Sequence, residues 1–190
     1  MVRSFLASGC GVNIKDNLGM TGLMGAVKNN HNSIVKLLLE QTTVDLNCVD
    51  KCGNTALHHA VFSGNVEGVQ LLLADCRLTT VNGINFIGRT PVMSAIYVEN
   101  ENCLRELVSH PSVDLDMMTM IWGDPENMAR WEIRNNSFSP SLLFCHRRRG
   151  FVEGERIVAE AREKRRRERG DNQAEGQRSL KSQEQVENIA

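Results

Sequence analysis

The strongest constraint on this chain is a sequence pattern that returns every 34 or 35 residues. From Asn13, Asn47 and Asn82 onward, equal offsets lead to a glycine, a threonine, an apolar residue and an alanine, and a weaker copy starts at Asp116. A period of this length is typical of a stack of small units, none of which can bury its apolar side chains alone. The recurring residues are Gly19, Gly53 and Gly88, Thr21, Thr55 and Thr90, Leu23, Leu57 and Val92, and Ala26, Ala60 and Ala95.

Each unit predicts two short helices after a tight turn. The glycine permits the positive φ that such a turn needs, and the threonine two residues later is placed to cap the first helix. The alanine is small enough to let neighbouring helices approach closely. The second helix carries an apolar stripe of helical period, which consists of Ile34, Val35, Leu37, Leu38 and Leu39 in the first unit and Val69, Leu71, Leu72 and Leu73 in the second.

These units resemble ankyrin repeats, whose signature joins a turn glycine, a Thr-Pro-Leu-His-x-Ala helix start and a leucine-rich second helix. The stretch "GNTALHHA" at residues 53–60 is the clearest copy. The proline of the motif survives only as Pro91, and its histidine only as His58, with Met24 and Met93 at the same position elsewhere. The resemblance implies an all-α solenoid of stacked helix-turn-helix units with projecting hairpin loops.

The register also predicts how the chain is divided. Because the pattern starts partway through a unit, we hypothesise a piece of a longer ankyrin protein. We expect the end of a truncated repeat at residues 1–12, ankyrin repeats at 13–46, 47–81 and 82–115, a degenerate capping repeat at 116–145, and a charged helix with a disordered tail at 146–190.

Composition narrows the setting in which the protein works. The formal net charge is −1, and no apolar run approaches the ~18–20 residues that a membrane span needs. The six cysteines stand at irregular spacing and favour reduced thiols in a cytoplasmic or nuclear protein. We expect a protein without a membrane segment that is located in the cytoplasm or also in the nucleus, and we expect it to be monomeric.

The segment from residue 146 onward is rich in charge. Residues 153–169 predict a highly charged helix with favourable i,i+4 pairs. The two basic clusters have three readings: a localisation signal, a nucleic-acid contact or a plain solvated helical extension. Interspersed glutamates and the lack of interleaved aromatic residues argue against nucleic acid. The clusters are Arg147, Arg148 and Arg149, and Lys164, Arg165, Arg166 and Arg167.

The adjacent histidines His58 and His59, with Cys48 and Cys52 upstream, raise the alternative of a zinc site. Neighbouring side chains on a helix diverge by about 100° and do not converge readily on one ion. In ankyrin repeats the first of these histidines hydrogen-bonds to the threonine and the next hairpin, which leaves His59 as the more exposed residue. No local nucleophile signature or phosphate-binding glycine loop is present. We predict no catalytic, cofactor-binding or metal-ligating residues and no small-molecule substrate.

The resemblance implies a protein-binding surface on the concave face, formed by hairpin tips and first helices. Aromatic residues carry much of the energy at interfaces, so Phe62 and Tyr97, aligned with Lys28, are the expected anchors. Leu18 and Met20 would contribute from the first unit. The full predicted set is Lys28, Lys51, Cys52, Asn54, His59, Phe62, Ile87, Arg89, Ser94 and Tyr97.

Two functions fit this surface. One is a non-catalytic adaptor or scaffold that binds a partner protein. The other is a nuclear regulator, an ankyrin-type inhibitor of a transcription factor or kinase, that uses the arginine-rich tail for import or for partner binding. The identity of the partner does not follow from the framework, because one fold supports unrelated targets.

Overall fold

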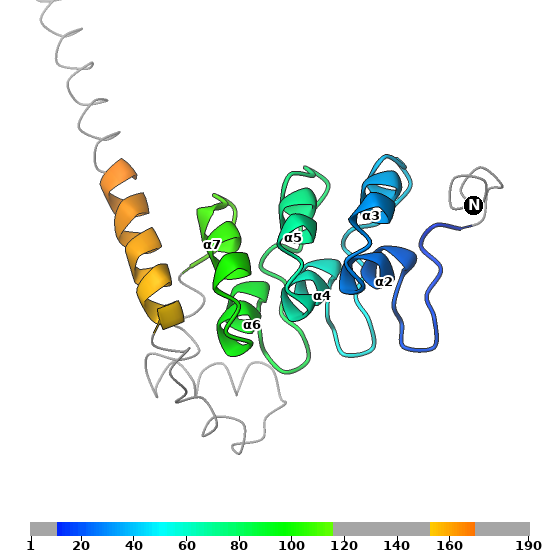
Figure 1. Ribbon diagram of the computed structural model, residues 1–190, viewed down its shortest axis with the longest axis horizontal. Helices are drawn as coiled ribbons and strands as arrows, with labels where there is room; N and C mark the ends of the chain where they lie inside the picture. The colour runs from blue at the N-terminus through cyan, green and yellow to red at the C-terminus, as the bar shows by residue number, and fades with distance from the viewer. Residues whose placement is uncertain (1–10, 116–152, 170–190) are drawn as a thin grey trace, which may run out of the picture.

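The computed structural model describes residues 11–115 and 153–169, which form a row of paired helices (Figure 1). The first helix of each pair lies in one layer and the second in the other, and the loops between pairs project beneath the first layer. Within the described residues there is no β-strand, only an isolated bridge between Lys15 and Thr21. The pairs are α2 (Gly22–Lys28) with α3 (Asn32–Leu39), α4 (Ala56–Ser63) with α5 (Val66–Leu73), and α6 (Pro91–Tyr97) with α7 (Glu101–Ser109).

The starts of the first helices follow the sequence signals closely. Thr21, Thr55 and Thr90 are the N-caps of α2, α4 and α6, and each side chain accepts a hydrogen bond from the backbone N–H three residues later. The turn glycines have φ values of 78°, 76° and 79°. At Gly53 a side chain would be strained for a second reason, since a Cβ would lie 2.9 Å from the backbone nitrogen of Phe86. The predicted turn and cap are confirmed.

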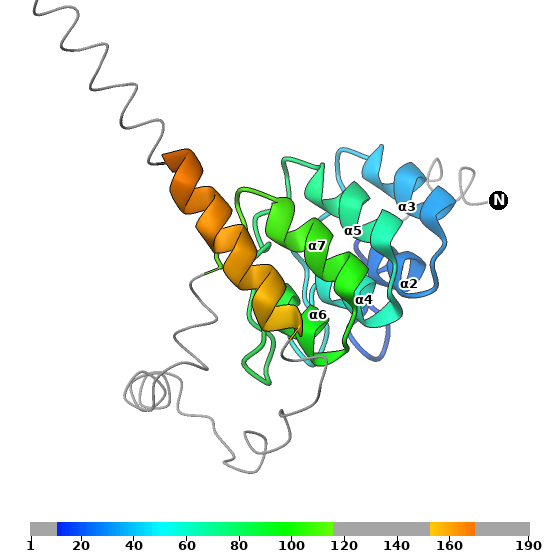
Figure 2. The same cartoon turned by 60° about the vertical axis from the view of Figure 1, so that its left-hand side comes forward.

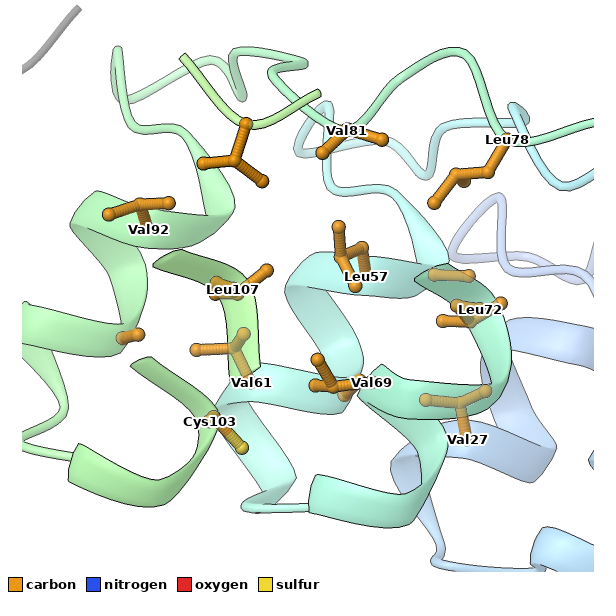
Figure 3. Close-up of a cluster of buried hydrophobic side chains, with 14 of the residues drawn as sticks. Val27, Leu57, Val61, Val69, Leu72, Leu78, Val81, Val92, Cys103 and Leu107 are labelled. Carbon is orange, nitrogen blue, oxygen red and sulfur yellow. The ribbon is translucent and has the colours of Figure 1, made fainter. Parts of the chain in front are cut away.

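The core lies between the two helix layers and runs through all three units (Figure 3). Leu57 and Val61 of α4 meet Val69 and Leu72 of α5, and all four are fully buried. Burial of one such side chain stabilises the fold by roughly 1.5–3 kcal/mol. Because each helix contacts its counterparts in neighbouring units as well as its own partner, no unit holds its core alone.

Three asparagines tie the start of each unit to the end of the same unit, where the chain leads into the next. Asn13 donates its amide to the carbonyl of Thr43 and accepts from the N–H of Asp45. Asn47 and Asn82 make the same pair of bonds one unit further along, to Arg77 and Thr79 and to Ser112 and Asp114. The residues from which the repeat register starts are therefore the residues that fix the spacing of the units.

Helix 153–169 packs against the last described unit, beside α6 and α7 (Figure 2). Ile157 and Val158 are only 4% and 2% exposed. Gly154 sits against Ile96, where a Cβ would come within 2.9 Å of both γ carbons. The expected helix is present, but the reading of it as a plain solvated extension is wrong, because one of its faces is part of the core.

Two arginines anchor this helix to the backbone of the third unit. Arg162 donates to the carbonyl of Leu115, and Arg165 donates to the carbonyls of Val113, Val108 and His110 at 2.6–2.8 Å. Arg77 forms the same kind of contact between the second unit and the first. It donates to the carbonyls of Leu39 and Gln41, both at 2.7 Å.

The two arginine contacts use equivalent positions of the repeat. In the register that starts at Asn13 and Asn82, Leu39 corresponds to Val108 and Gln41 to His110. Arg165 therefore binds the carbonyls that the next unit would bind in a longer stack. Helix 153–169 covers the end of the third unit in the place of a further repeat.

The predicted capping repeat at 116–145 and the end of the disordered tail lie outside the described residues, as does most of the truncated repeat at 1–12. None of the helices in the described ranges is long and apolar enough to cross a membrane.

Candidate functional site

The projecting hairpins are held in shape by an acidic or amide side chain in each. Asp16 accepts hydrogen bonds from the N–H groups of Leu18 and Met20, both at 2.8 Å. Asp50 does the same for Cys52 and Asn54, and Asn85 for Ile87 and Arg89. Side-chain oxygens that bind the backbone in this way favour a turn locally. The three hairpins therefore share one conformation.

Neighbouring hairpins are also bonded to one another. The N–H of Lys51 donates to the carbonyl of Leu18 at 3.0 Å, and the N–H of Phe86 donates to the carbonyl of Cys52 at 2.9 Å. The side chain of Asn85 donates to Asn54 at 2.9 Å. These bonds fix the side chains at the hairpin tips as a preformed surface, which lowers the entropy lost on binding.

His58 links α4 to the third hairpin. Its Nδ1 accepts from the N–H of Thr55, and its Nε2 lies 3.0 Å from the carbonyl of Arg89. Since Nδ1 accepts, the proton of the neutral ring is on Nε2, which donates to that carbonyl. Burial lowers the pKa of His58 to about 4. The predicted scaffold role of His58 is confirmed.

His59 is more exposed than His58, at 7% against 0%, yet it is still buried. Its Nε2 donates to Oδ2 of Asp50 at 2.9 Å. Burial lowers the pKa of His59, although the Asp50 carboxylate opposes this. Burial raises the pKa of Asp50, but hydrogen bonds from Asn54, Cys52 and His59 outweigh it and hold that pKa below its usual value. His59 is therefore the more exposed of the two histidines, as expected, but it is itself buried, and its role as a contact residue stays a prediction.

The zinc alternative fails on the geometry of its own ligands. Both ring nitrogens of His58 are bonded to protein groups, and the thiol of Cys48 donates to Asp45. Within residues 11–115 and 153–169, no three histidine, cysteine, aspartate or glutamate side chains gather in a way that would hold a metal ion. Burial also raises the pKa of Cys48, and that of Cys103 to about 11, so neither thiol is an activated nucleophile.

The predicted contact residues divide by exposure. Arg89 and Ser94 are buried, as His59 is, and Asn54 is half-buried, so these four shape the surface from below. The guanidinium of Arg89 lies 3.7 Å from the ring centre of Tyr97 and supports that ring as a cation–π partner. The exposed predicted residues are Lys28, Lys51, Cys52, Phe62, Ile87 and Tyr97.

Sequence reasoning missed Phe86, which is 73% exposed at a hairpin tip and is the most exposed large apolar residue of the described ranges. Its register position is that of Lys51, which was predicted as a contact, so the same offset would have found it. The nine exposed large apolar residues of the described ranges all lie on hairpins or at the ends of first helices, and none lies on α3, α5 or α7. They are Ile14, Leu18, Val49, Phe62, Ile84, Phe86, Ile87, Tyr97 and Val98.

The second basic cluster is split by the packing of helix 153–169. Lys164, Arg166 and Arg167 are exposed, while Arg165 is bonded to backbone carbonyls of the third unit. The first cluster, Arg147 to Arg149, lies outside the described residues.

Comparison with known proteins gives the same architecture. Residues 1–82 match the family model described as ankyrin repeats in three copies. The chain is 26% identical to an ankyrin repeat protein of Rickettsia bellii over 113 residues, which is 59% of this chain and 61% of that protein. It is 45% identical to another from Rickettsia felis over 62 residues, 32% of this chain and 20% of that one.

Much larger proteins share the pattern too. The chain is 31% identical over 133 residues to the neurogenic locus notch homolog protein 1 of Mus musculus, which is 67% of this chain but 5% of that protein. The region matched by this chain thus spans less than two thirds of the length of each of these relatives. The recurring register, the paired helices with threonine caps and projecting hairpins, and these matches together show that this chain contains a solenoid of ankyrin repeats.

Proposed function

We propose that this chain is a non-catalytic adaptor or scaffold that binds a partner protein through the hairpins and first helices of its ankyrin stack. Ankyrin repeats generally mediate protein–protein interaction. The proposal adds which surface of this chain binds the partner. One observation carries the proposal: the nine exposed large apolar residues of the described ranges gather on this side of the stack. Apolar side chains collected on one preformed face are typical of an interaction site.

The anchors are the aromatic residues at the ends of two neighbouring helices. Phe62 lies in the last turn of α4 and Tyr97 is the last residue of α6, and their exposed fractions are 41% and 48%. Tyr97 is held over Arg89, and Phe62 stands 6.5 Å from His59 in an edge-on arrangement. Rigid aromatic groups of this kind contribute the most binding energy per side chain.

Replacing both anchors tests the proposal. F62A/Y97A should weaken binding of the partner by about 100-fold or more, since aromatic hot spots contribute about 2 kcal/mol or more each. The measurement is quantitative mass spectrometry of proteins that co-purify with tagged full chain. Q70A/N102A, two exposed changes on the second helices α5 and α7, is the matched control. Proteins lost with both variants, or with neither, would contradict the proposed surface.

A second candidate is the nuclear regulator. It is favoured by the exposure of Lys164, Arg166 and Arg167 on one helix, where a basic-cluster receptor has access to them. K164A/R166A/R167A should then shift a fluorescently tagged full chain from the nucleus to the cytoplasm. Arg156→Ala, at an exposed position of the same helix, is the control. If the triple variant distributes as the unsubstituted chain does, the cytoplasmic adaptor is the better function.

A further inference from the structure

We infer that the binding face has a direction: it fits a peptide segment with carboxylates at the end that meets the first unit and aromatic or branched aliphatic residues at the end that meets the third. This inference rests on the proposed function and specifies the chemistry of its partner. It follows from comparing the same exposed positions along the stack.

The third unit makes the apolar end. Its exposed residues Ile84, Phe86, Tyr97 and Val98 stand where the first unit has Lys15, Asn17, Lys28 and Asn29. Two exposed apolar residues of the first unit depart from this pattern: Leu18, whose row ends in Ile87, and Ile14, which stands where the third unit has Gly83. The second unit is mixed, with Val49 and Phe62 beside Lys51 and Ser63. The change from polar to apolar therefore runs along the row of units.

The first unit and the neighbouring tip make the basic end. Lys28 and Lys51 are exposed, and within the described residues no carboxylate forms an ion pair with either. The carboxylates nearest in sequence are held by hydrogen bonds within their own hairpins and are not paired with these lysines. Asp16 accepts from two backbone N–H groups, and Asp50 accepts from His59, Cys52 and Asn54.

In the layer of second helices, by contrast, basic side chains do form ion pairs with carboxylates. There Lys36 pairs with Glu67 at 2.6 Å, and Arg105 pairs with Glu101. At the apolar end of the face, the exposed acid Glu99 follows Val98 and would repel a carboxylate placed there, whereas the guanidinium of Arg89 is buried against the ring of Tyr97. Complementary charge that attracts at one end and repels at the other fixes the orientation of a partner.

The distance between the two ends limits the partner further. Lys28, Phe62 and Tyr97 occupy one register position at the ends of α2, α4 and α6. Packed helices lie 8–10 Å apart, so the row is about 16–20 Å long. An extended peptide covers this length in about five or six residues, at about 3.3 Å each. Acidic and apolar residues at that separation would reach both ends at once.

The test uses random 16-residue peptides displayed on phage and selected on the full chain. We expect selected peptides to carry acidic residues on one side of aromatic or aliphatic ones. For a selected peptide, Lys28→Glu should weaken binding about tenfold, as removal of the peptide carboxylate should. Lys36→Glu, in the second helix of the same unit, is the matched control and should leave binding unchanged.

A double-mutant cycle locates each end. Replacing the peptide carboxylate should cost affinity on the unsubstituted chain but not on K28E or, as an independent variant, K51E. Replacing its aromatic residue should cost affinity on the unsubstituted chain but not on Y97A. Peptides that need Phe62 and Tyr97 but show no acidic preference and no coupling to Lys28 or Lys51 would overturn the direction and leave the proposed function standing. Peptides insensitive to all four positions would overturn both.

Discussion

Val158→Asp is expected to lower the free energy of unfolding by about 3 kcal/mol, because it places a carboxylate on the buried face of helix 153–169. Val158 is 2% exposed and packs with Ile157 against the last described unit. A charge there has two outcomes, burial without a partner or release of the helix. Either one removes the apolar contacts of the helix from the folded state.

Urea unfolding of the full chain measures the size of this effect, and hydrogen exchange locates it. Loss of protection should be largest in α6 and α7, which contact the helix, and smallest in α2 and α3. Ala159→Asp introduces the same side chain at the next, exposed position of the same helix and should cost far less. Equal losses for the two variants would mean that helix 153–169 contributes little to the stack.

The size of this effect follows from how repeat proteins are built. Their stability is close to a sum of unit and interface terms, and about three units are needed for a stack to fold. The described chain has three helix pairs, so one more interface is a large share of the total. Arg165 completes that interface with the same carbonyl positions that Arg77 binds inside the stack.

The scaffold of the repeats could be predicted from residue types and spacing alone. The turn glycine, the threonine cap and His58 act over a few residues or at one repeat offset, so the repeat register contains all the information they need. The placement of helix 153–169 could not be predicted in this way. Its charge pattern specifies a helix, but only three-dimensional packing shows that Ile157 and Val158 face the third unit.

The candidate site was predicted in outline and misjudged in detail. Register correctly placed Phe62 and Tyr97 on the exposed side, yet Ser94, at a register position shared with His59, is fully buried. How deeply a side chain is buried depends on which groups of the neighbouring hairpin and helix contact it. Asp50 draws His59 inward through a hydrogen bond, which a repeat motif does not encode.

Acid should destabilise this protein, and His58→Met should remove much of that sensitivity. His58 is fully buried, and its pKa falls from the ordinary 6.5 to about 4. Met is the natural choice for the exchange, because Met24 and Met93 occupy this position in the other two units and are themselves buried. The variant therefore keeps a side chain that the fold already accepts here.

The sign follows from proton binding in the two states. Below pH 6.5 the unfolded chain binds a proton at His58, while the folded chain resists it until about pH 4. The folded state is therefore favoured fully above pH 6.5, and this contribution is lost as the pH falls toward 4. A shift of this size corresponds to at most about 3 kcal/mol. His59 acts in the same direction, since burial lowers its pKa too.

The difference in stability between His58→Met and the unsubstituted chain should consequently change with pH. At pH 7.5 His58→Met should be less stable by about 1 kcal/mol or more, because the carbonyl of Arg89 loses its donor. At pH 4.5 the difference should vanish or reverse, since the buried methionine has nothing to protonate. Urea midpoints at the two pH values measure both stabilities, and His31→Met, the same exchange at an exposed histidine, is the control. A His58→Met chain that loses as much stability on acidification as the unsubstituted chain would show that His58 is not the acid-sensitive group, and would direct attention to the Asp50 and His59 pair.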